Sequence, residues 1–325
     1  MENKTVLARD TQFGKEVHEG LTAFPKHLSS KYFYDETGDK LFQDIMAMPA
    51  YYLTESEYAI LEKYGAEIAQ RFVAEGQPFS LFELGAGDGK KTKILLRQLV
   101  ENKVDFDYRP IDISQNALDQ LETSIKAELP AVNVNPLQGT YFDTLKDIGQ
   151  ENGRRKIILF LGSNIGNLLH PQAIDFLQQM TAVLGENDLL FMGMDQKKHP
   201  QAILNAYNDK EGITAAFNKN ILKRINTEFQ GDFDLDKFIH WEVYDPENGT
   251  AKSYLVATEK QLITIKALDL KISFSKWETI HTEISQKYDD PTVEWLAGKA
   301  GLRILTSFAD ENHFFKDYIL KKQLQ

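Results

Sequence analysis

The sequence predicts an α/β protein with a doubly wound, mostly parallel sheet, interrupted by an inserted second domain. Between residues 79 and 194, short apolar segments alternate with segments whose apolar residues recur at helical spacing. The first apolar segment ends in a glycine-rich loop. The alternation stops after Met194 and resumes only near the C-terminus. A chain of 325 residues is long enough for two domains at roughly 150 residues each.

Each element of the sheet follows from its local pattern. Residues 56–74 have the spacing of an amphipathic helix, and residues 79–84 form a Phe- and Leu-rich strand. The run at 157–161 is continuously apolar, which is typical of a parallel strand covered on both faces. The other expected strands are 106–113 and 188–194, and the helices between strands are 91–99, 116–128 and 171–184.

The rest of the chain has a different rhythm. Residues 1–60 and 197–240 are expected to be mainly helical, followed by strands at 254–258, 262–265 and 280–285. A helix at 292–300 and strands at 302–308 and 313–320 would close the sheet with an antiparallel pair. The predicted domains are therefore 61–196 with 287–325, and 1–60 with 197–286.

Composition excludes several classes of function. Asp and Glu total 48 against 37 Lys and Arg, a net charge of −11, which argues against nucleic acid or an anionic membrane as the main partner. The absence of cysteine excludes disulfides, thiolate metal sites and cysteine nucleophiles. The seven histidines show no HxxxH or HExxH spacing, so no metal site is predicted. The N-terminus has no apolar signal core, and we expect a cytoplasmic monomer.

The glycine loop carries the first functional signal. It reads Glu83-Leu-Gly85-Ala-Gly87-Asp-Gly89 between a predicted strand and a predicted helix. A GxGxG loop with an acid two residues earlier is the pattern of S-adenosylmethionine (SAM) sites, whereas a dinucleotide site requires GxGxxG. Asp112, at the end of the next strand, suits ribose hydroxyls in either kind of site. On its own, the loop leaves a SAM site, a nicotinamide site and a plain tight turn open.

Longer motifs distinguish these readings. They are KYFYDETG at 31–38, PAYYLT at 49–54, FLGSNIGN at 160–167, TAAFN at 214–218 and TEIS at 282–285. In this order, together with the glycine loop, they resemble the histidine-specific SAM-dependent methyltransferases of ergothioneine biosynthesis. The resemblance extends from about residue 20 to the C-terminus.

The resemblance implies a reaction and a division of labour. The reaction is Nα-methylation of L-histidine, three times on one amine, to give the betaine hercynine. The fold it implies is a Rossmann-like class I SAM methyltransferase sheet with an inserted α+β substrate domain, so that 61–196 and 287–325 bind SAM while 1–60 and 197–286 bind a small amino acid. The positions that match cofactor-binding residues are Tyr34, Gly85, Lys91, Asp112, Thr140, Tyr141 and Gly162.

The acceptor residues implied by the resemblance each have an ordinary structural alternative. Tyr51 matches a tyrosine beside the reacting amine, and Asn167 and Tyr207 match positions that hold the carboxylate. Both tyrosines could instead be core residues, and Asn167 could cap the following helix. Glu283 and Ser285 match the pair that holds the imidazole; they lie two apart on a predicted strand, so they could equally be the outward polar face of that strand.

The type of each residue fits the chemistry of methyl transfer. An amide such as Asn167 can donate two hydrogen bonds to a carboxylate. A phenol, with an ordinary pKa of about 10, is a poor base at neutral pH, so Tyr51 would orient the amine while the proton leaves to solvent. Lys91 could be a solvated residue, but a lysine at the start of a helix opposes the helix dipole, which favours a ligand role.

Two positions depart from the family pattern. Thr140-Tyr141 stands where the family has an Asp-Phe pair near the adenine, and Ser253 stands where it often has a methionine beside the imidazole. A wider or more polar wall at Ser253 would admit another acceptor. The alternative function is therefore Nα-methylation of another amino acid or of an aromatic amine.

Overall fold

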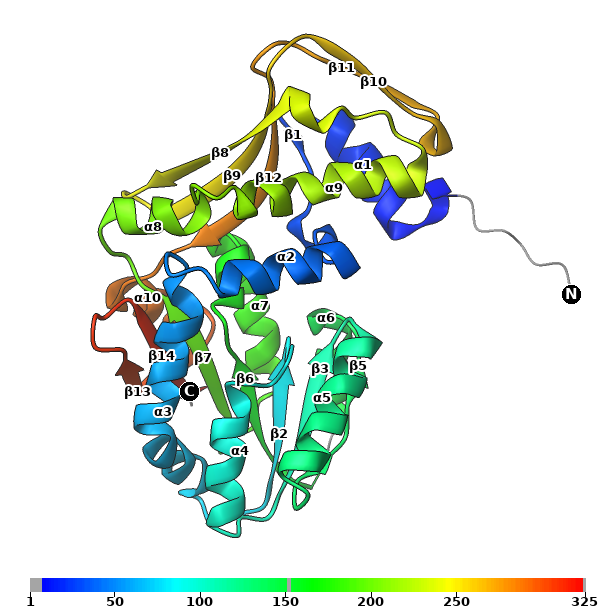
Figure 1. The fold of residues 1–325 in the computed structure, drawn as a ribbon. Coiled ribbons are helices and arrows are strands. Elements are labelled where there is room, and N and C mark those ends of the chain that lie inside the picture. The colour runs from blue at the N-terminus through cyan, green and yellow to red at the C-terminus, as the bar shows by residue number, and fades with distance from the viewer. Residues whose placement is uncertain (1–7, 151–152, 324–325) are drawn as a thin grey trace, which may run out of the picture. The chain divides into compact units, whose positions relative to one another are not determined.

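The computed structural model describes residues 8–150 and 153–323 (Figure 1). Contacts divide the chain into two compact units. The small unit contains the described residues of Met1–Tyr52 and Lys198–Ser285, and the large unit contains those of Leu53–Lys197 and Gln286–Gln325. The predicted domain borders at residues 196 and 286 lie next to two of these division points. The predicted border at residue 60 falls inside a continuous helix, α3 (Tyr52–Val73).

An eight-stranded sheet forms the centre of the large unit. Its strands have the order β13-β14-β7-β6-β2-β3-β4, with β5 also paired to β3. The strands from β7 to β4 are parallel to their neighbours, and β14 runs antiparallel to both β7 and β13. The predicted fold class is therefore confirmed, including the antiparallel pair that closes the sheet. The strands are β2 (Phe79–Leu84), β3 (Phe106–Asp112), β4 (Asn133–Val134), β5 (Leu137–Gln138), β6 (Arg155–Phe160), β7 (Leu189–Asp195), β13 (Leu302–Ala309) and β14 (Phe315–Lys322).

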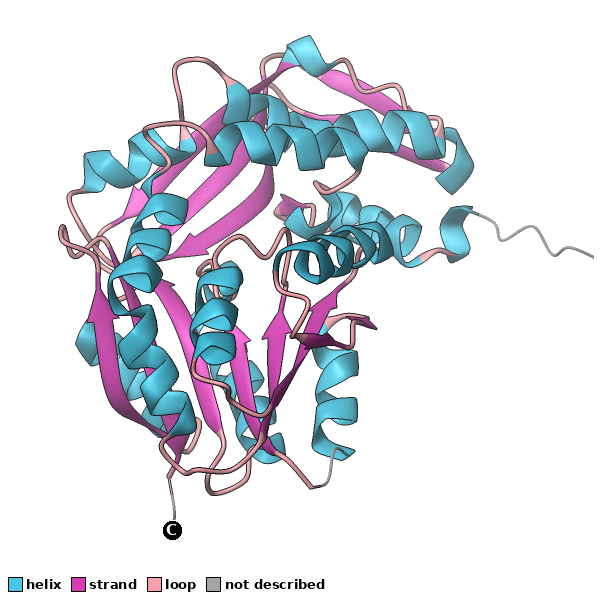
Figure 2. Ribbon diagram, turned by 60° about the horizontal axis from the view of Figure 1, so that its bottom comes forward, coloured by secondary structure: helices cyan, strands magenta, loops and turns pink. Residues whose placement is uncertain are grey.

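Helices cover both faces of this sheet, and Figure 2 shows its strands running between them. One face packs on α6, α7 and α10 through a single apolar cluster that includes Phe160, Phe176 and Leu296. On the other face, Phe72 of α3 meets Phe191 of β7 edge to face, with ring centroids 5.7 Å apart. The helices are α3 (Tyr52–Val73), α4 (Thr92–Glu101), α5 (Gln115–Glu128), α6 (Tyr141–Gln150), α7 (His170–Val183), α10 (Asp290–Lys299) and the 3₁₀ turn η3 (Asn164–Asn167).

The small unit has its own sheet, in the order β1-β12-β9-β8, and a separate β10–β11 hairpin. Its core joins α1, α2 and α9 to the sheet and contains Val17, Phe33, Phe217 and Leu255. The elements are η1 (Ala8–Asp10), α1 (Gln12–Thr22), β1 (Lys26–His27), η2 (Ser30–Tyr32), α2 (Glu36–Met46), α8 (Pro200–Tyr207), α9 (Ile213–Phe229), η4 (Leu235–Lys237), β8 (Phe238–Asp245), β9 (Thr250–Ala257), β10 (Gln261–Ile265), η5 (Lys266–Leu268), β11 (Leu270–Phe274) and β12 (Thr279–Gln286).

The expectation that residues 197–240 are mostly helical is confirmed by α8, α9 and η4, although β8 already starts at Phe238. In this strand the exposed positions include Trp241 and Val243, so apolar residues on both faces hide the alternation that identifies a strand. The sequence also gave no sign of β11, which pairs with β10 as a hairpin. Within the described residues, no helix is long and apolar enough to cross a bilayer.

Candidate active site

The glycine loop follows β2 with all three glycines at positive φ. Gly85 has φ +73°, and a Cβ built on it would lie 2.6 Å from the Tyr141 hydroxyl oxygen and 3.1 Å from Asn164 Nδ2. A Cβ on Gly87, at φ +52°, would meet nothing within 4 Å. Gly85 is therefore required both by backbone conformation and by space, whereas Gly87 is required by conformation alone. The loop has no side chain at either glycine, so a ligand can approach its backbone closely there.

Asp112 lies at the end of β3, as predicted, and braces this loop. Its carboxylate accepts the backbone N–H groups of Gly87, at 3.3 Å, and of Ser114, at 3.0 Å. The carboxylate of Asp112 is half-buried and can accept more than these two hydrogen bonds. It can therefore accept further bonds from ligand hydroxyls.

Thr140 and Tyr141 open α6 and have different surroundings. The Thr140 hydroxyl accepts the N–H of Asp143 and donates to its carboxylate at 2.6 Å, so it caps the helix. Tyr141 packs edge to face on Phe160, with centroids 5.3 Å apart. Burial and the charge of Asp112 raise the pKa of Tyr141, so its phenol stays neutral beside Gly85.

Lys91 stands directly before α4, and its ammonium pairs with the buried carboxylate of Glu57 from α3. Glu57 also accepts the backbone N–H of Gly162 with both of its oxygens, each at 2.9 Å. Burial opposes the charged form of Lys91, but Glu57 and its acidic neighbours outweigh it and raise the pKa of Lys91. With 24% of its side chain exposed, Lys91 is a held cation rather than a solvated one.

Glu83, the acid before the first glycine, points into the interior. It is 3% exposed and accepts hydrogen bonds from the hydroxyls of Thr92 and Tyr108. Burial raises the pKa of Glu83 to about 7. Its carboxyl group is thus occupied in joining β2, β3 and α4.

Asn167 ends the 3₁₀ turn η3 at the carboxyl edge of β6, and its side chain is exposed. Leu169 occupies the N-cap position of α7, so Asn167 is not the cap of that helix. Sequence reasoning missed two residues nearby, Asn164, which contacts the loop at Gly85, and Glu57. A signal for Glu57 does exist, because it falls on the apolar stripe of α3 with Leu53, Ile60 and Leu61.

A second group of predicted residues lies within the small unit. The Tyr207 hydroxyl of α8 and the Ser285 hydroxyl of β12 are 2.7 Å apart and hydrogen-bonded. The ring of Tyr51 meets Tyr207 edge to face at 6.1 Å. Three residues separated by up to 234 positions thus form one contiguous cluster, with phenol and hydroxyl groups side by side.

Glu283, two residues before Ser285, belongs to a second polar chain of the same unit. Its carboxylate lies 3.5 Å from the Ser253 hydroxyl of β9, and Ser253 donates to the buried Glu242 of β8 at 2.6 Å. Glu242 and Ser253 are direct partners across the β8–β9 ladder. Ser253 is therefore placed between two carboxylates.

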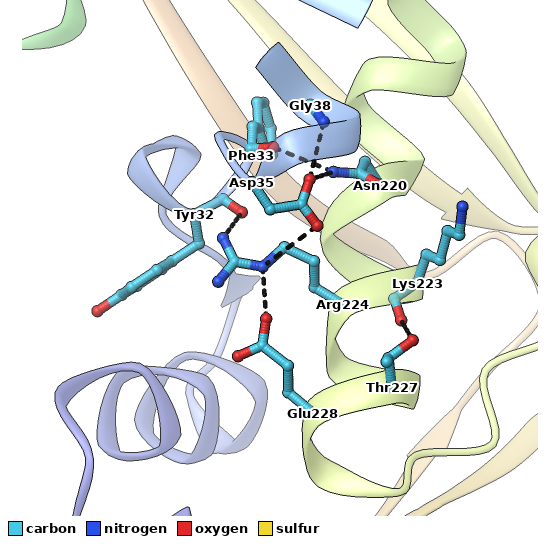
Figure 3. Close-up of polar contacts among 9 residues, drawn as sticks. All are labelled: Tyr32, Phe33, Asp35, Gly38, Asn220, Lys223, Arg224, Thr227 and Glu228. Carbon is cyan, nitrogen blue, oxygen red and sulfur yellow. Dashed lines mark hydrogen bonds and ion pairs between the residues drawn. The ribbon is translucent and has the colours of Figure 1, made fainter. Parts of the chain in front are cut away.

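The residues on either side of Tyr34 are held by hydrogen bonds from α9, which Figure 3 shows for Tyr32, Phe33 and Asp35. Asn220 of α9 donates to the Phe33 carbonyl at 3.1 Å and to the Asp35 carboxylate at 2.8 Å. Arg224, one turn further along α9, donates to the Tyr32 carbonyl at 2.8 Å. These bonds fix the backbone on both sides of Tyr34, a residue that is 41% exposed.

The predicted residues thus form two groups, each inside one unit. Gly85, Lys91, Asp112, Tyr141 and Gly162 surround the glycine loop of the large unit, and the phenols, hydroxyls and carboxylate described above belong to the small unit. Across residues 8–150 and 153–323, no three His, Asp or Glu side chains gather as metal ligands. The chemistry on offer is hydrogen bonding, ion pairing and positioning.

Comparison with known proteins identifies a family. The model of the family described as "Histidine-specific methyltransferase, SAM-dependent" matches residues 13–322. The histidine N-alpha-methyltransferase of Mycolicibacterium smegmatis is 35% identical over 89% of this chain and 88% of its own length. That of Mycobacterium tuberculosis is 34% identical over 91% of each chain. The L-tryptophan methyltransferase trpM of Psilocybe serbica is 30% identical over 90% of this chain and 88% of its own.

Proposed function

Because the chain belongs to the histidine-specific, SAM-dependent methyltransferase family, we propose that it methylates the α-amine of L-histidine, three times, to give hercynine. The large unit would hold the methyl donor and the small unit the amino acid. The observation that carries the proposal is the Tyr51–Tyr207–Ser285 cluster, because these residues are far apart in sequence and the family resemblance gives all three to an amino acid site.

The glycine loop of the large unit fits the methyl donor. A Cβ at Gly85 would fill the space in front of Tyr141, and Asp112 has acceptor capacity for ribose hydroxyls. Lys91 supplies a held cation for a carboxylate, and neutral Tyr141 offers an aromatic surface for a base. When bound, SAM supplies a methyl group on a positively charged sulfur.

The small unit would fix the acceptor by both ends. Hydroxyl groups of Tyr207 and Ser285 can donate and accept, so each can turn a hydrogen bond toward a bound amino acid. Glu283 would accept an N–H of the imidazole ring.

The chain's contribution to the reaction is positioning. The amine must be neutral to attack, and it loses its proton to solvent because the phenol of Tyr51 is a weak base. Tyr51, held edge-on by Tyr207, would aim the nitrogen lone pair. The amine nitrogen forms a bond to the methyl carbon as the carbon–sulfur bond breaks, and orientation alone can supply most of the acceleration.

The surroundings of Ser253 favour histidine over an uncharged aromatic acceptor. Ser253 donates to the buried carboxylate of Glu242, and its hydroxyl also lies 3.5 Å from the carboxylate of Glu283, the residue proposed to hold the ring. An imidazole offers two N–H groups when protonated, and nearby carboxylates stabilise that charged form. An indole offers one N–H and no charge.

A direct assay tests the proposal. The purified protein is incubated with SAM and each amino acid separately, and products are read by mass for added methyl groups. We expect up to three methyl groups on L-histidine and none on its Nα-blocked derivative. Methylation of tryptophan or another amine, with histidine unchanged, would instead support the alternative suggested by the trpM relative.

A pair of variants links the assay to the site. Ser285→Ala removes the 2.7 Å bond to Tyr207 and should raise the KM for histidine about fivefold, since one hydrogen bond contributes about 1 kcal/mol. The KM for SAM should not change. Thr227→Ala, which alters a hydroxyl bonded only to the Lys223 carbonyl of its own helix, is the matched control.

A further inference from the structure

Two buried carboxyl groups of the large unit share one small space. Glu57 of α3 and Asp317 of β14 are both 0% exposed. A Cβ built on Gly193 of β7 would lie 2.0 Å from Glu57 Oε1 and 3.0 Å from Asp317 Oδ1. Gly193 is the ladder partner of Asp317, so its lack of a side chain makes room for the pair.

The two carboxyl groups differ in their hydrogen-bond partners. Glu57 accepts hydrogen bonds from the Lys91 ammonium and the Gly162 N–H and has capacity for one more. Neither oxygen of Asp317 receives a hydrogen bond from any donor in the described chain. An ionised, unpartnered carboxylate at full burial would be very costly, and the cost is removed when Asp317 keeps its proton and donates it to Glu57.

The local charges agree with this assignment. Burial and the negative charge of Glu57 raise the pKa of Asp317 far above its usual value, and Lys91 offsets only part of the shift. The titratable groups that face the pair are Lys91 at the start of α4 and Glu83 at the end of β2. One cation, Lys91, thus faces the three acids. Because the space is buried, the Glu57–Asp317 pair is favoured with a single negative charge, which lies on Glu57.

Resting on the proposed function, we propose that Glu57 and Asp317 form a proton-sharing pair that positions Lys91 beside the Gly162 backbone to hold the amino-acid end of the methyl donor. Both are positioning residues that act through Lys91 and Gly162. Without Glu57, the Lys91 ammonium would lose the partner that fixes it beside Gly162, where a Cβ would lie 3.6 Å from Lys91 Nζ.

The test compares two neutral thioethers that differ only in the part under discussion. S-adenosylhomocysteine carries the amino-acid end, and 5′-methylthioadenosine lacks it. In Glu57→Gln we expect the Kd for S-adenosylhomocysteine to rise about tenfold, the worth of about one charged hydrogen bond, while the Kd for methylthioadenosine changes less than about twofold. In a Lys91→Met background, Glu57→Gln should add no further loss. Lys90→Met, at the neighbouring exposed lysine, is the control and should bind both ligands as the parent does.

A second pair of variants tests whether Asp317 donates a proton to Glu57. Asp317→Asn keeps a donor toward Glu57 and should bind S-adenosylhomocysteine as the parent does at pH 7. We expect the parent to bind more weakly at alkaline pH, where Asp317 would lose its proton, and the Asn variant to lack that part of the weakening. Asp317→Val removes the donor and should weaken S-adenosylhomocysteine selectively.

Equal losses for both ligands in Glu57→Gln, or equal effects of Asn and Val at position 317, would show a purely structural role and overturn the inference. These binding experiments need no acceptor. A protein that binds as described but methylates no amino acid would contradict the proposed function and leave the positioning pair standing.

Discussion

Replacing Gly85 by alanine perturbs the site in a way whose magnitude can be worked out. Two costs add at this position. The φ of +73° places an alanine in the left-handed region, which costs about 1 kcal/mol. The new Cβ would also lie 2.6 Å from the Tyr141 hydroxyl oxygen, and forcing a packed aromatic aside costs about 1–3 kcal/mol. We therefore expect Gly85→Ala to lower the free energy of unfolding by about 2–4 kcal/mol.

Two further variants separate these costs. Gly87→Ala, at φ +52° with nothing within 4 Å of its Cβ, should show the conformational cost alone, about 1 kcal/mol. When Gly85→Ala is combined with Tyr141→Phe, the hydroxyl oxygen is removed. The atom of residue 141 nearest to the new Cβ is then Cζ, at 3.5 Å, which is an ordinary contact. The double variant should recover most of the second cost, leaving the 3.1 Å approach to Asn164 Nδ2.

Thermal and urea unfolding without ligand measure these differences, at about 2–4 °C of melting temperature per kcal/mol for a chain unit of this size. Tyr141→Phe alone gives the baseline for the double variant. The reasoning is refuted if alanine costs the same at positions 85 and 87, or if removing the Tyr141 hydroxyl leaves the cost of Gly85→Ala unchanged.

Three other predictions concern the small unit. Tyr51→Phe should slow single-turnover methyl transfer about tenfold with an unchanged melting temperature, because a hydroxyl that orients the amine is lost while the ring contact with Tyr207 remains; equal rates would remove Tyr51 from the mechanism. Asn220→Ala should lower the free energy of unfolding by about 1–3 kcal/mol, because the Phe33 carbonyl and the Asp35 carboxylate lose a donor, and an effect no larger than that of Thr227→Ala would contradict this. Burial lowers the pKa of His240 to about 4, so the folded chain binds fewer protons than the unfolded chain between pH 4 and about 6.5, and stability should fall as pH falls through that window, by about 3 kcal/mol for this residue. Urea unfolding at several pH values should show a shallower fall in His240→Gln, and parallel curves for parent and variant would contradict the assignment.

The parallel strands were predictable because burial on both faces leaves a continuous apolar run. The predicted strand at 157–161 is β6, Arg155–Phe160, and the one at 188–194 is β7, Leu189–Asp195. The strand β8 was not predictable in the same way. It has one exposed face that carries Trp241 and Val243, so its pattern does not alternate between apolar and polar.

The candidate site was predictable where chemistry follows a short motif. The pattern of a strand, a glycine turn and an aspartate at the end of the next strand predicted where Gly85 and Asp112 lie. The reason is that the carboxyl ends of adjacent parallel strands share one edge. Glu57 and Asp317 could not be found in this way. Each is a single acid among apolar neighbours, and only the tertiary packing of α3 against β14 and β7 brings their carboxyls to one point.

Ser253 shows how a substitution can be misjudged when its partner is unseen. Read alone, a serine in place of a methionine suggests a wider, more polar wall and a looser preference for histidine. In the ladder, Ser253 faces Glu242 and donates to it, so the serine replaces an apolar contact by a path to a second carboxylate. The partner lies on β8, a strand that the sequence did not reveal, eleven residues away along the chain. Ser253→Ala would remove the hydroxyl that lies between the two carboxylates, so we expect it to reduce methylation of histidine, whose ring Glu283 is proposed to hold, more than methylation of any uncharged aromatic acceptor.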